Sequence, residues 1–149
     1  MELVITDEKD ERFITLSYAM DDEYRESYGG EVSKYCVCSQ LDEYHFVLLA
    51  LNYGKAIACA GFRVVDADSI EIRRVYVSKR HRRNRIAYKL IRQLEKIAID
   101  YGYRNSYCIT HRKNNEAILL FKKLDYEVGD NFENRNQSVC MKKEFKSLI

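Results

Sequence analysis

Glu71-Ile-Arg-Arg-Val-Tyr-Val-Ser-Lys-Arg-His-Arg-Arg-Asn-Arg-Ile-Ala-Tyr-Lys-Leu-Ile-Arg92 is the stretch that decides the fold. Its first part, through Val77, is rich in β-branched and aromatic residues, which is typical of a strand. From about Asn84, apolar residues recur at the spacing of one helix face. They are Ile86, Leu90, Ile91, Leu94, Ile97 and Ala98. A basic loop joins strand to helix. The first N–H groups of a helix lack partners within it and lie at its positive end, so this unit predicts a phosphate site.

Strands and helices of ordinary length surround this unit. The turn at 52–55 predicts a hairpin in which Gly54 adopts a positive φ. Residues 31–43 have no clear pattern, although a short helix would fit, and 129–137 form a polar loop. The expected elements are strand 2–6, helix 7–28, strands 45–51, 56–65 and 69–77, a helix from about 84 to 102, strand 103–110, a helix capped by Asn114, and strands 126–128 and 138–145.

This order of elements predicts one α+β domain over residues 1–149, with the three-layer character of α/β proteins. An antiparallel meander comes first, and a βαβ unit around the phosphate site follows. We therefore expect a central mixed, mostly antiparallel sheet of about six to seven strands flanked by helices.

The composition is that of an ordinary globular domain, with 149 residues and 46% hydrophobic content. No run of 18 apolar residues occurs, so no membrane span is expected. The N-terminus lacks the basic start and apolar core of a signal peptide. Five cysteines form an odd set without a scaffold-like spacing, which favours reduced thiols and a cytoplasmic location.

Charge is distributed unevenly along the chain. Residues 1–50 hold 12 Asp/Glu and 4 Lys/Arg, a net of −8, whereas residues 51–149 hold 11 and 21, a net of +10. The second part therefore suits an anionic ligand and the first a cationic one. For the acidic part, ordinary solvated surface charge is the alternative interpretation.

Four stretches follow one another in a fixed order: strand 71–77, loop 82–87, segment 114–126 and strand 138–145. The loop reads Arg-Arg-Asn-Arg-Ile-Ala, and the segment reads Asn-x-x-Ala-x-x-x-Phe-x-x-x-Asp-Tyr. Together they resemble the GNAT superfamily of acyl-CoA-dependent N-acetyltransferases, whose patterns are Arg/Gln-x-x-Gly-x-Gly/Ala and Asn-x-x-Ala-x-x-x-Tyr-x-x-x-Gly-Phe. Residues 59–63 and the region after Tyr28 are similar to bacterial general acetyltransferases.

The resemblance implies the GNAT fold, acetyl-CoA as co-substrate and no metal. Loop 82–88 would hold the pyrophosphate, and main-chain groups of 75–77 would stabilise the oxyanion formed at the thioester. Glu71 would take the proton from the amine, with a strand carboxylate paired to Arg63 or Arg73 as the alternative. The implied cofactor-binding residues are Val75, Tyr76, Val77, Arg82, Arg83, Asn84, Arg85, Ile86, Ala87, Tyr88, Asn114 and Phe121.

Two positions depart from the family pattern. Arg85 replaces the first loop glycine, and a left-handed backbone there would cost a non-glycine residue about 1–2 kcal/mol. Arginine would offset part of this by direct contact with phosphate. Phe121 replaces the tyrosine that in many members protonates the departing CoA thiolate. Tyr88 and Tyr126 are candidate substitutes, although core packing is the better interpretation for Tyr126.

The sequence thus predicts a cytoplasmic enzyme that moves an acetyl group from acetyl-CoA to a primary amine by direct transfer in a ternary complex. The acceptor, a small molecule or a peptide amine, would lie between the N-terminal helical region and the 129–137 loop. A cationic amine is favoured by the acidic first third. Cys108 and Cys140 have no evident base for an acyl-enzyme route.

Other classes of function stay open. A non-catalytic acyl-CoA-binding or regulatory domain is one, because of Phe121 and Arg85. A nucleic-acid-binding protein that uses the basic segment 79–92 is another, although nucleic acid is the less favoured partner because no aromatic interleaving accompanies the charges. Homodimer formation is left open. The isolated pairs Cys36-x-Cys38 and Cys108-x-x-His111 do not make a metal site.

Overall fold

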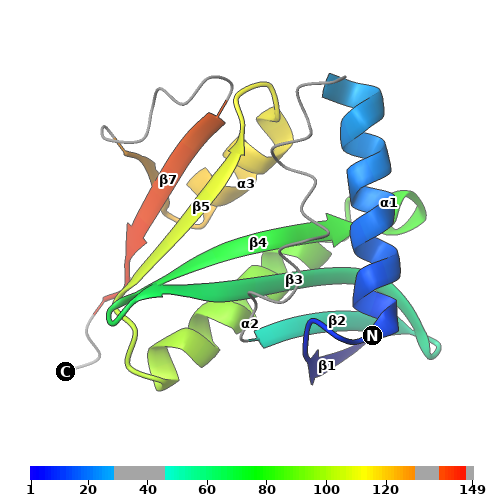
Figure 1. Ribbon diagram of the computed structural model, residues 1–149, viewed down its shortest axis with the longest axis horizontal. Coiled ribbons are helices and arrows are strands. Elements are labelled where there is room, and N and C mark those ends of the chain that lie inside the picture. The colour runs from blue at the N-terminus through cyan, green and yellow to red at the C-terminus, as the bar shows by residue number, and fades with distance from the viewer. Residues whose placement is uncertain (29–45, 130–137, 147–149) are drawn as a thin grey trace.

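The computed structural model describes residues 1–28, 46–129 and 138–146. Figure 1 shows how the helices and strands within these ranges are arranged. The elements are β1 (Glu2–Thr6), α1 (Glu11–Tyr28), β2 (Phe46–Asn52), β3 (Lys55–Asp66), β4 (Ser69–Val77), a 3-10 turn (Lys79–His81), α2 (Ile86–Asp100), β5 (Asn105–His111), α3 (Asn115–Lys123), β6 (Glu127–Val128) and β7 (Ser138–Glu144). No helix in this part of the chain is long and apolar enough to cross a membrane.

The strands form one seven-stranded sheet in the order β1-β2-β3-β4-β5-β7-β6. Strands β4 and β5 pair in parallel, and α2 connects them; every other neighbouring pair is antiparallel. A parallel pair needs a crossover connection, which explains why a helix separates these two strands. The expected mixed, mostly antiparallel sheet with a βαβ unit is confirmed.

Helices cover both faces of this sheet, so the three-layer prediction is also confirmed. Figure 1 shows α1 on the face toward the viewer and α2 on the opposite face. Alternate residues of a strand point to opposite faces. In β2, Val47 and Leu49 accordingly pack with Phe13 of α1, whereas Leu48 belongs to the larger core cluster, which includes Leu90 of α2.

The two longest helices begin later than the sequence indicates. Helix α1 starts at Glu11 because the side chains of Asp7 and Asp10 accept from the N–H groups of Lys9 and Arg12, a turn that competes with the helix. Helix α2 starts at Ile86 rather than near 84, because a left-handed residue precedes it. Residues 31–43, and the loop beyond Gly129, lie outside the described ranges.

Candidate active site

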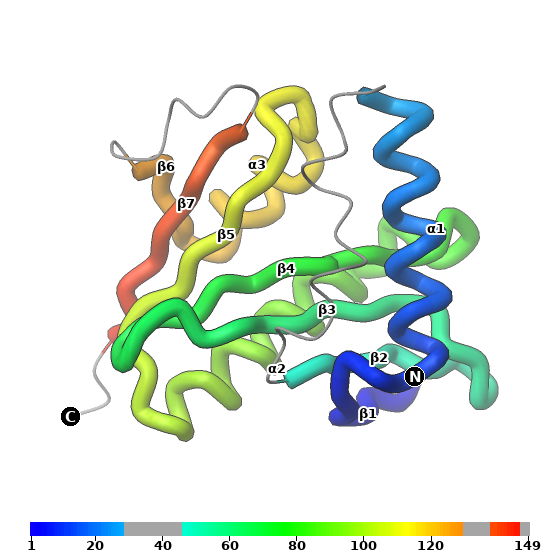
Figure 2. The backbone as a smooth tube through the Cα atoms, in the orientation of Figure 1, coloured from blue at the N-terminus to red at the C-terminus, as the bar shows by residue number. Residues whose placement is uncertain are grey.

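Strands β4 and β5 pair over a short distance and then separate. Their parallel register joins Ser69–Ile72 to Asn105–Cys108 and stops there, although both strands continue. Figure 2 shows the two strands diverging from this point. We call this place the β4–β5 fork: one arm is residues 73–77 of β4, and the other is 109–111 of β5. Main-chain groups on the inner edge of each arm therefore have no partner in the other strand.

A β-bulge accompanies the separation. The β3–β4 register shifts between Cys59 and Gly61, and Arg74 adopts a positive φ of 57°. An extra residue at a bulge bends its strand and increases the local twist. The bulge thus bends β4 at the residue where its arm of the fork begins.

The Arg74 side chain lies on the face of the sheet that α1 covers. Its guanidinium Nη1 donates to Asp21 Oδ1 of α1 at 2.5 Å, and the side chains are 3% and 0% exposed. A buried charge without a partner is strongly unfavourable, so each group requires the other. Cys59 Sγ also donates to the Arg74 carbonyl oxygen at 3.3 Å. The bulge is therefore held from both its main chain and its side chain.

The next turns of α1 contact the other arm of the fork. Asn114 Nδ2 donates to the Tyr24 hydroxyl oxygen at 3.4 Å, and Asn114 is the cap residue of α3, directly after β5. The Tyr28 ring stacks on His111, the last residue of β5, with centroids 4.1 Å apart. Because Asp21, Tyr24 and Tyr28 follow at i, i+3 and i+7, one face of α1 reaches both arms.

The basic loop before α2 has the backbone of a glycine-containing loop. Arg83 and Arg85 both adopt positive φ values, of 69° and 60°. The first α2 amide with a backbone acceptor is that of Lys89, which donates to the Arg85 carbonyl oxygen at 3.0 Å. No side chain caps this end, so the amides of residues 86–88 point out of the helix unbonded. The left-handed conformation considered for Arg85 is present.

Among the loop arginines, Arg82 is engaged within the chain. Its Nε donates to the Val77 carbonyl oxygen at 2.8 Å, and its Nη2 donates to Glu23 Oε1 of α1 at 2.8 Å. The Tyr76 hydroxyl donates to the same carboxylate. Burial, helped by Glu23, raises the pKa of Tyr76 to about 12. Arg82 thus ties the loop to α1, whereas Arg83 and Arg85 are exposed.

Glu71 lies in β4 just before the fork and is 4% exposed. Arg63 Nε and Nη2 donate to its Oε1 at 2.8 Å, and Arg73 Nε lies 3.6 Å from its Oε2. The ion pairing that the sequence left as an alternative is therefore present. The ion pairing does not test whether the remaining lone pairs of Glu71 accept a proton from an amine. The role of Glu71 as the base therefore stays a prediction.

The position of the family's usual proton donor is part of the core. Phe121 is 4% exposed and packs edge-on against Tyr126, with centroids 4.9 Å apart. The Tyr126 hydroxyl in turn hydrogen-bonds Glu95 and Ser106, and burial raises its pKa well above the usual range. Tyr126 is thus a core residue, as its sequence position indicates. Tyr88 lies under the Arg85 guanidinium, 4.6 Å from it.

Two thiols near the fork are buried and protonated. Cys108 is 2% and Cys140 3% exposed. Burial is the main reason why the pKa of Cys108 lies well above its usual value and that of Cys140 is about 11. A thiolate is the nucleophilic form of cysteine, so both are poor acyl acceptors. Among the described residues, no three His, Cys, Asp or Glu side chains gather as a metal site.

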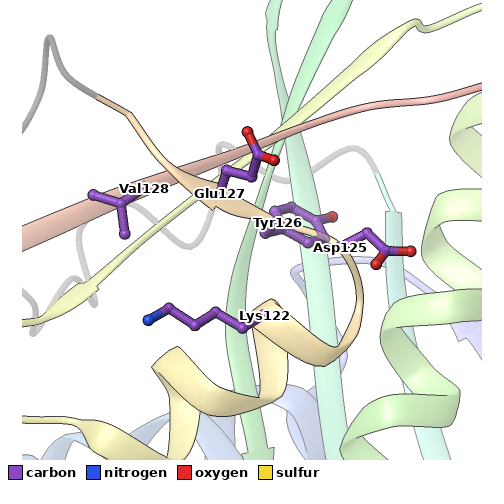
Figure 3. A pocket seen from close by; sticks show the side chains of 5 residues that line it. All are labelled: Lys122, Asp125, Tyr126, Glu127 and Val128. Carbon is purple, nitrogen blue, oxygen red and sulfur yellow. The ribbon is translucent and has the colours of Figure 1, made fainter.

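A surface hollow of about 420 Å³ lies away from the fork, where α3 turns into β6. Figure 3 shows its lining side chains, which come from the end of α3 and from the strand that follows. They are Lys122, Asp125, Tyr126, Glu127 and Val128. The hollow brings together none of the predicted cofactor-binding residues, and it does not form part of the candidate site.

The model of the Acetyltransferase (GNAT) family matches residues 6–126. The chain belongs to this family. Three solved structures are similar in fold. The N-acetyltransferase PaiA from Thermoplasma acidophilum, in complex with coenzyme A, is 21% identical over 97% of this chain and 100% of that chain, with a TM-score of 0.72. An acetyltransferase from Streptococcus agalactiae is 11% identical over 96% and 98%, with a TM-score of 0.79. An aminoglycoside 6′-N-acetyltransferase complexed with coenzyme A is 16% identical over 97% of each chain, with a TM-score of 0.71.

The fork and the loop contain residues that the sequence analysis expected to bind the cofactor, and that role stays a prediction. Residues 75–77 lie within the β4 arm, and 82–88 form the loop and the first turn of α2. Asn114 caps α3, its Oδ1 accepting from the Ala117 amide at 3.2 Å. Sequence reasoning missed the contribution of α1. The spacing of Asp21, Tyr24 and Tyr28 on one helix face was the available signal.

Proposed function

We propose that this GNAT protein transfers an acetyl group from acetyl-CoA directly to a primary amine. The observation that carries the proposal is the β4–β5 fork beside the unbonded start of α2. The fork offers main-chain donors and acceptors that no strand uses, and the helix start offers a positive dipole to phosphate. An elongated ligand with a diphosphate at one end and amides along its arm matches this arrangement.

Each part of the proposed site has a defined task. The amides of residues 86–88 and the guanidinium groups of Arg83 and Arg85 would bind the diphosphate. Main-chain groups of residues 75–77 would bind the arm and stabilise the negative charge that develops on the thioester oxygen. Phe121, in the core beneath the fork, would shape the wall rather than contribute a proton.

Direct transfer is favoured over an acyl-enzyme because the thiols near the fork are poor nucleophiles. Cys108 and Cys140 are held neutral by burial, and a neutral buried thiol is a weak nucleophile. In direct transfer, the amine must lose its proton before attack, and we assign this task to Glu71, acting through water.

The role of Glu71 can be tested against its ion pairing. We expect Glu71→Gln to lower kcat by about 100-fold or more. Arg63→Met breaks the same ion pair but leaves the carboxylate, so it should lower stability while largely retaining kcat. If both variants lose stability and both keep kcat per folded molecule, Glu71 is a structural residue only.

A cationic amine is the proposed acceptor class. Helix α1 leads toward the fork with Asp22 and Glu26 exposed on its last turns. One protein of the same fold is named an aminoglycoside acetyltransferase, and aminoglycosides carry several amines. A panel of spermidine, kanamycin and a lysine-containing peptide, set against neutral and anionic amines, tests the class. Turnover confined to neutral or anionic amines would exclude it.

The first experiment is calorimetric titration of acetyl-CoA. We expect micromolar binding, weakened about tenfold in Arg83→Gly and in Arg85→Gly, a loss of about 1.4 kcal/mol each. Glycine adopts a positive φ without strain, so these variants remove the charge and keep the loop conformation. Lys55→Ala, in the β2–β3 hairpin, is the control that removes a distant charge. Absence of binding to the unmodified protein would overturn the proposal.

A non-catalytic acyl-CoA-binding role is the second candidate, because Phe121 places no hydroxyl in the position of the usual proton donor. It predicts micromolar acetyl-CoA binding with no transfer to any amine of the panel. Nucleic-acid binding by residues 79–92 predicts instead a duplex affinity that falls steeply with salt. Acetyl-CoA binding, transfer to the amine panel and duplex binding together separate the three functions.

A further inference from the structure

Breaking a thioester releases a thiolate, which needs a proton. The described site lacks the tyrosine hydroxyl that usually supplies this proton. Phe121 has no hydroxyl, and the Tyr126 hydroxyl is committed to Glu95 and Ser106 in the core. Tyr88 lies at the diphosphate end of the site, under Arg85, rather than at the fork. If the proposed acetyl transfer is correct, another group must protonate the leaving sulfur.

The Tyr24 hydroxyl lies where the two arms of the fork face each other. It accepts from Asn114 beyond the β5 arm, it lies beside Thr110 of β5, and it is close enough to Arg74 of the β4 arm to be influenced by its charge. Thr110 is 6% exposed, and its hydroxyl lies beside that of Tyr24. Polar groups from α1, β5 and α3 therefore converge at this point.

Asn114 does not accept the proton of the Tyr24 hydroxyl. Asn114 Oδ1 accepts from the Ala117 amide, so its orientation is fixed and Nδ2 must face Tyr24. Nδ2 is only a donor, so the Tyr24 oxygen accepts from it. Asn114 therefore does not accept the phenolic hydrogen, and Thr110 is the other side chain within hydrogen-bond reach of this hydroxyl.

We propose that Tyr24 is the proton donor to the leaving thiolate, in place of the hydroxyl that Phe121 lacks. This assignment rests on the proposed acetyl transfer. In the step, a bond forms between the amine nitrogen and the acetyl carbon, and the carbon–sulfur bond breaks with its electron pair going to sulfur. The Tyr24 proton goes to that sulfur. The proton lost by the amine leaves through the base, and the phenolate recovers a proton from water.

The protonation state of Tyr24 fits this role. Burial raises the pKa of its phenol, and Tyr28 on the same helix adds to the rise, whereas Asn114, Thr110 and Arg74 lower it. The phenol is therefore neutral at neutral pH and holds the proton to be given. Asn114 and Arg74 would stabilise the phenolate that forms when the proton leaves.

Tyr24→Phe tests the assignment with the amine of the panel that is turned over fastest. We expect kcat to fall by about 100-fold or more, with the acetyl-CoA dissociation constant changed by less than about threefold. Tyr53→Phe is the matched control, because it removes the same hydroxyl from a fully exposed tyrosine in the turn between β2 and β3; its kcat should stay within about twofold.

A pH profile separates proton donation from support of the fold. Incorporation of 3-fluorotyrosine at position 24 should restore most of kcat and move the alkaline limb of the profile to lower pH, because fluorine acidifies the phenol. A structural role would leave that limb unmoved. If Tyr24→Phe no longer binds acetyl-CoA, or if it keeps its kcat, the assignment of Tyr24 is wrong, and the proposed function is not affected. Absence of transfer by the unmodified protein would overturn it together with the proposed function.

Discussion

Gly102 and Asp125 occupy the same position at the ends of α2 and α3. In each case the following residue donates back across the turn, Tyr103 to the Ala98 carbonyl oxygen at 3.0 Å and Tyr126 to that of Phe121 at 2.9 Å. This is the Schellman arrangement, whose turning residue is left-handed and usually glycine. The φ values are 94° for Gly102 and 71° for Asp125. Aspartate thus carries backbone strain that glycine would not.

We expect Asp125→Gly to stabilise the protein by about 1 kcal/mol, since it relieves the left-handed strain and removes a negative charge from a helix C-terminus. Gly102→Asp is the reciprocal control and should destabilise by a similar amount. A Cβ at Gly102 would meet nothing within 4 Å, so its effect reports backbone conformation alone. Urea denaturation measures both. Equal stability of Asp125→Gly and the unmodified protein would contradict the strain argument.

At the scale of elements, the contact between α1 and the bulge in β4 depends on the ion pair of Asp21 and Arg74. Both side chains are almost completely buried, so removal of one charge takes a close buried partner away from the other. Such losses typically amount to about 3–5 kcal/mol, far more than for an exposed pair. Asp22, the next residue along α1, forms an exposed pair with Arg25.

We therefore expect Asp21→Asn to destabilise the protein by about 3–5 kcal/mol, and Asp22→Asn by less than about 1 kcal/mol. Urea denaturation of both variants gives the comparison. Adding Arg74→Met to Asp21→Asn should recover part of the loss, because the buried guanidinium that has lost this carboxylate partner is then gone. Equal effects of the two Asp→Asn changes would mean that the buried pair does not hold the bulge.

At the scale of the whole molecule, the buried thiols and the buried phenol together lower stability at high pH. Burial raises the pKa of Cys59 to about 12 and that of Cys140 to about 11, and the pKa values of Cys108 and Tyr126 are also raised. In the unfolded chain these groups lose their protons at lower pH. The folded protein therefore binds more protons than the unfolded one at alkaline pH, and its stability falls as pH rises.

We expect the urea midpoint to be steady near neutral pH and to fall from about pH 9 toward pH 11, the window between the ordinary and raised thiol pKa values. Cys59→Ala should have a lower midpoint at neutral pH but a shallower fall. Tyr53→Phe, at a fully exposed tyrosine, is the control and should leave the slope unchanged. A midpoint that stays constant up to pH 11 would contradict this view of the buried acids.

The sequence alone predicted the parts of this molecule that depend on local pattern. The helical spacing from Ile86 to Ala98 and the apolar strands gave the sheet and the βαβ unit, because periodicity reports which face of an element is buried. The phosphate loop followed from the positive end of the helix that it opens, and the cap residue Asn114 followed from the preference for Asn at helix starts. Boundaries were less exact, since Asp10 and Arg85 shift the helix starts through side-chain bonds and backbone conformation that periodicity does not reveal.

Contacts between distant segments could not be predicted from one sequence. Nothing in the chain order pairs Asp21 with Arg74 or Tyr24 with Asn114, which are separated by 53 and 90 residues. The engagement of Arg82 by Glu23 has the same origin: a basic loop suggests phosphate, but only the fold shows which of its charges is already neutralised. The polar side chains that complete the candidate site are therefore the part that required a structure.

The attachment of α1 to both arms of the fork has a thermodynamic consequence for ligand association. Because Asp21 and Tyr24 contact opposite arms, the separation of the strands is established when the chain folds and not when a ligand arrives. The conformational entropy of ordering the binding surface is then lost in advance, which is the basis of preorganisation. Association should proceed with little backbone rearrangement, so its rate is set by encounter and orientation rather than by opening of the sheet.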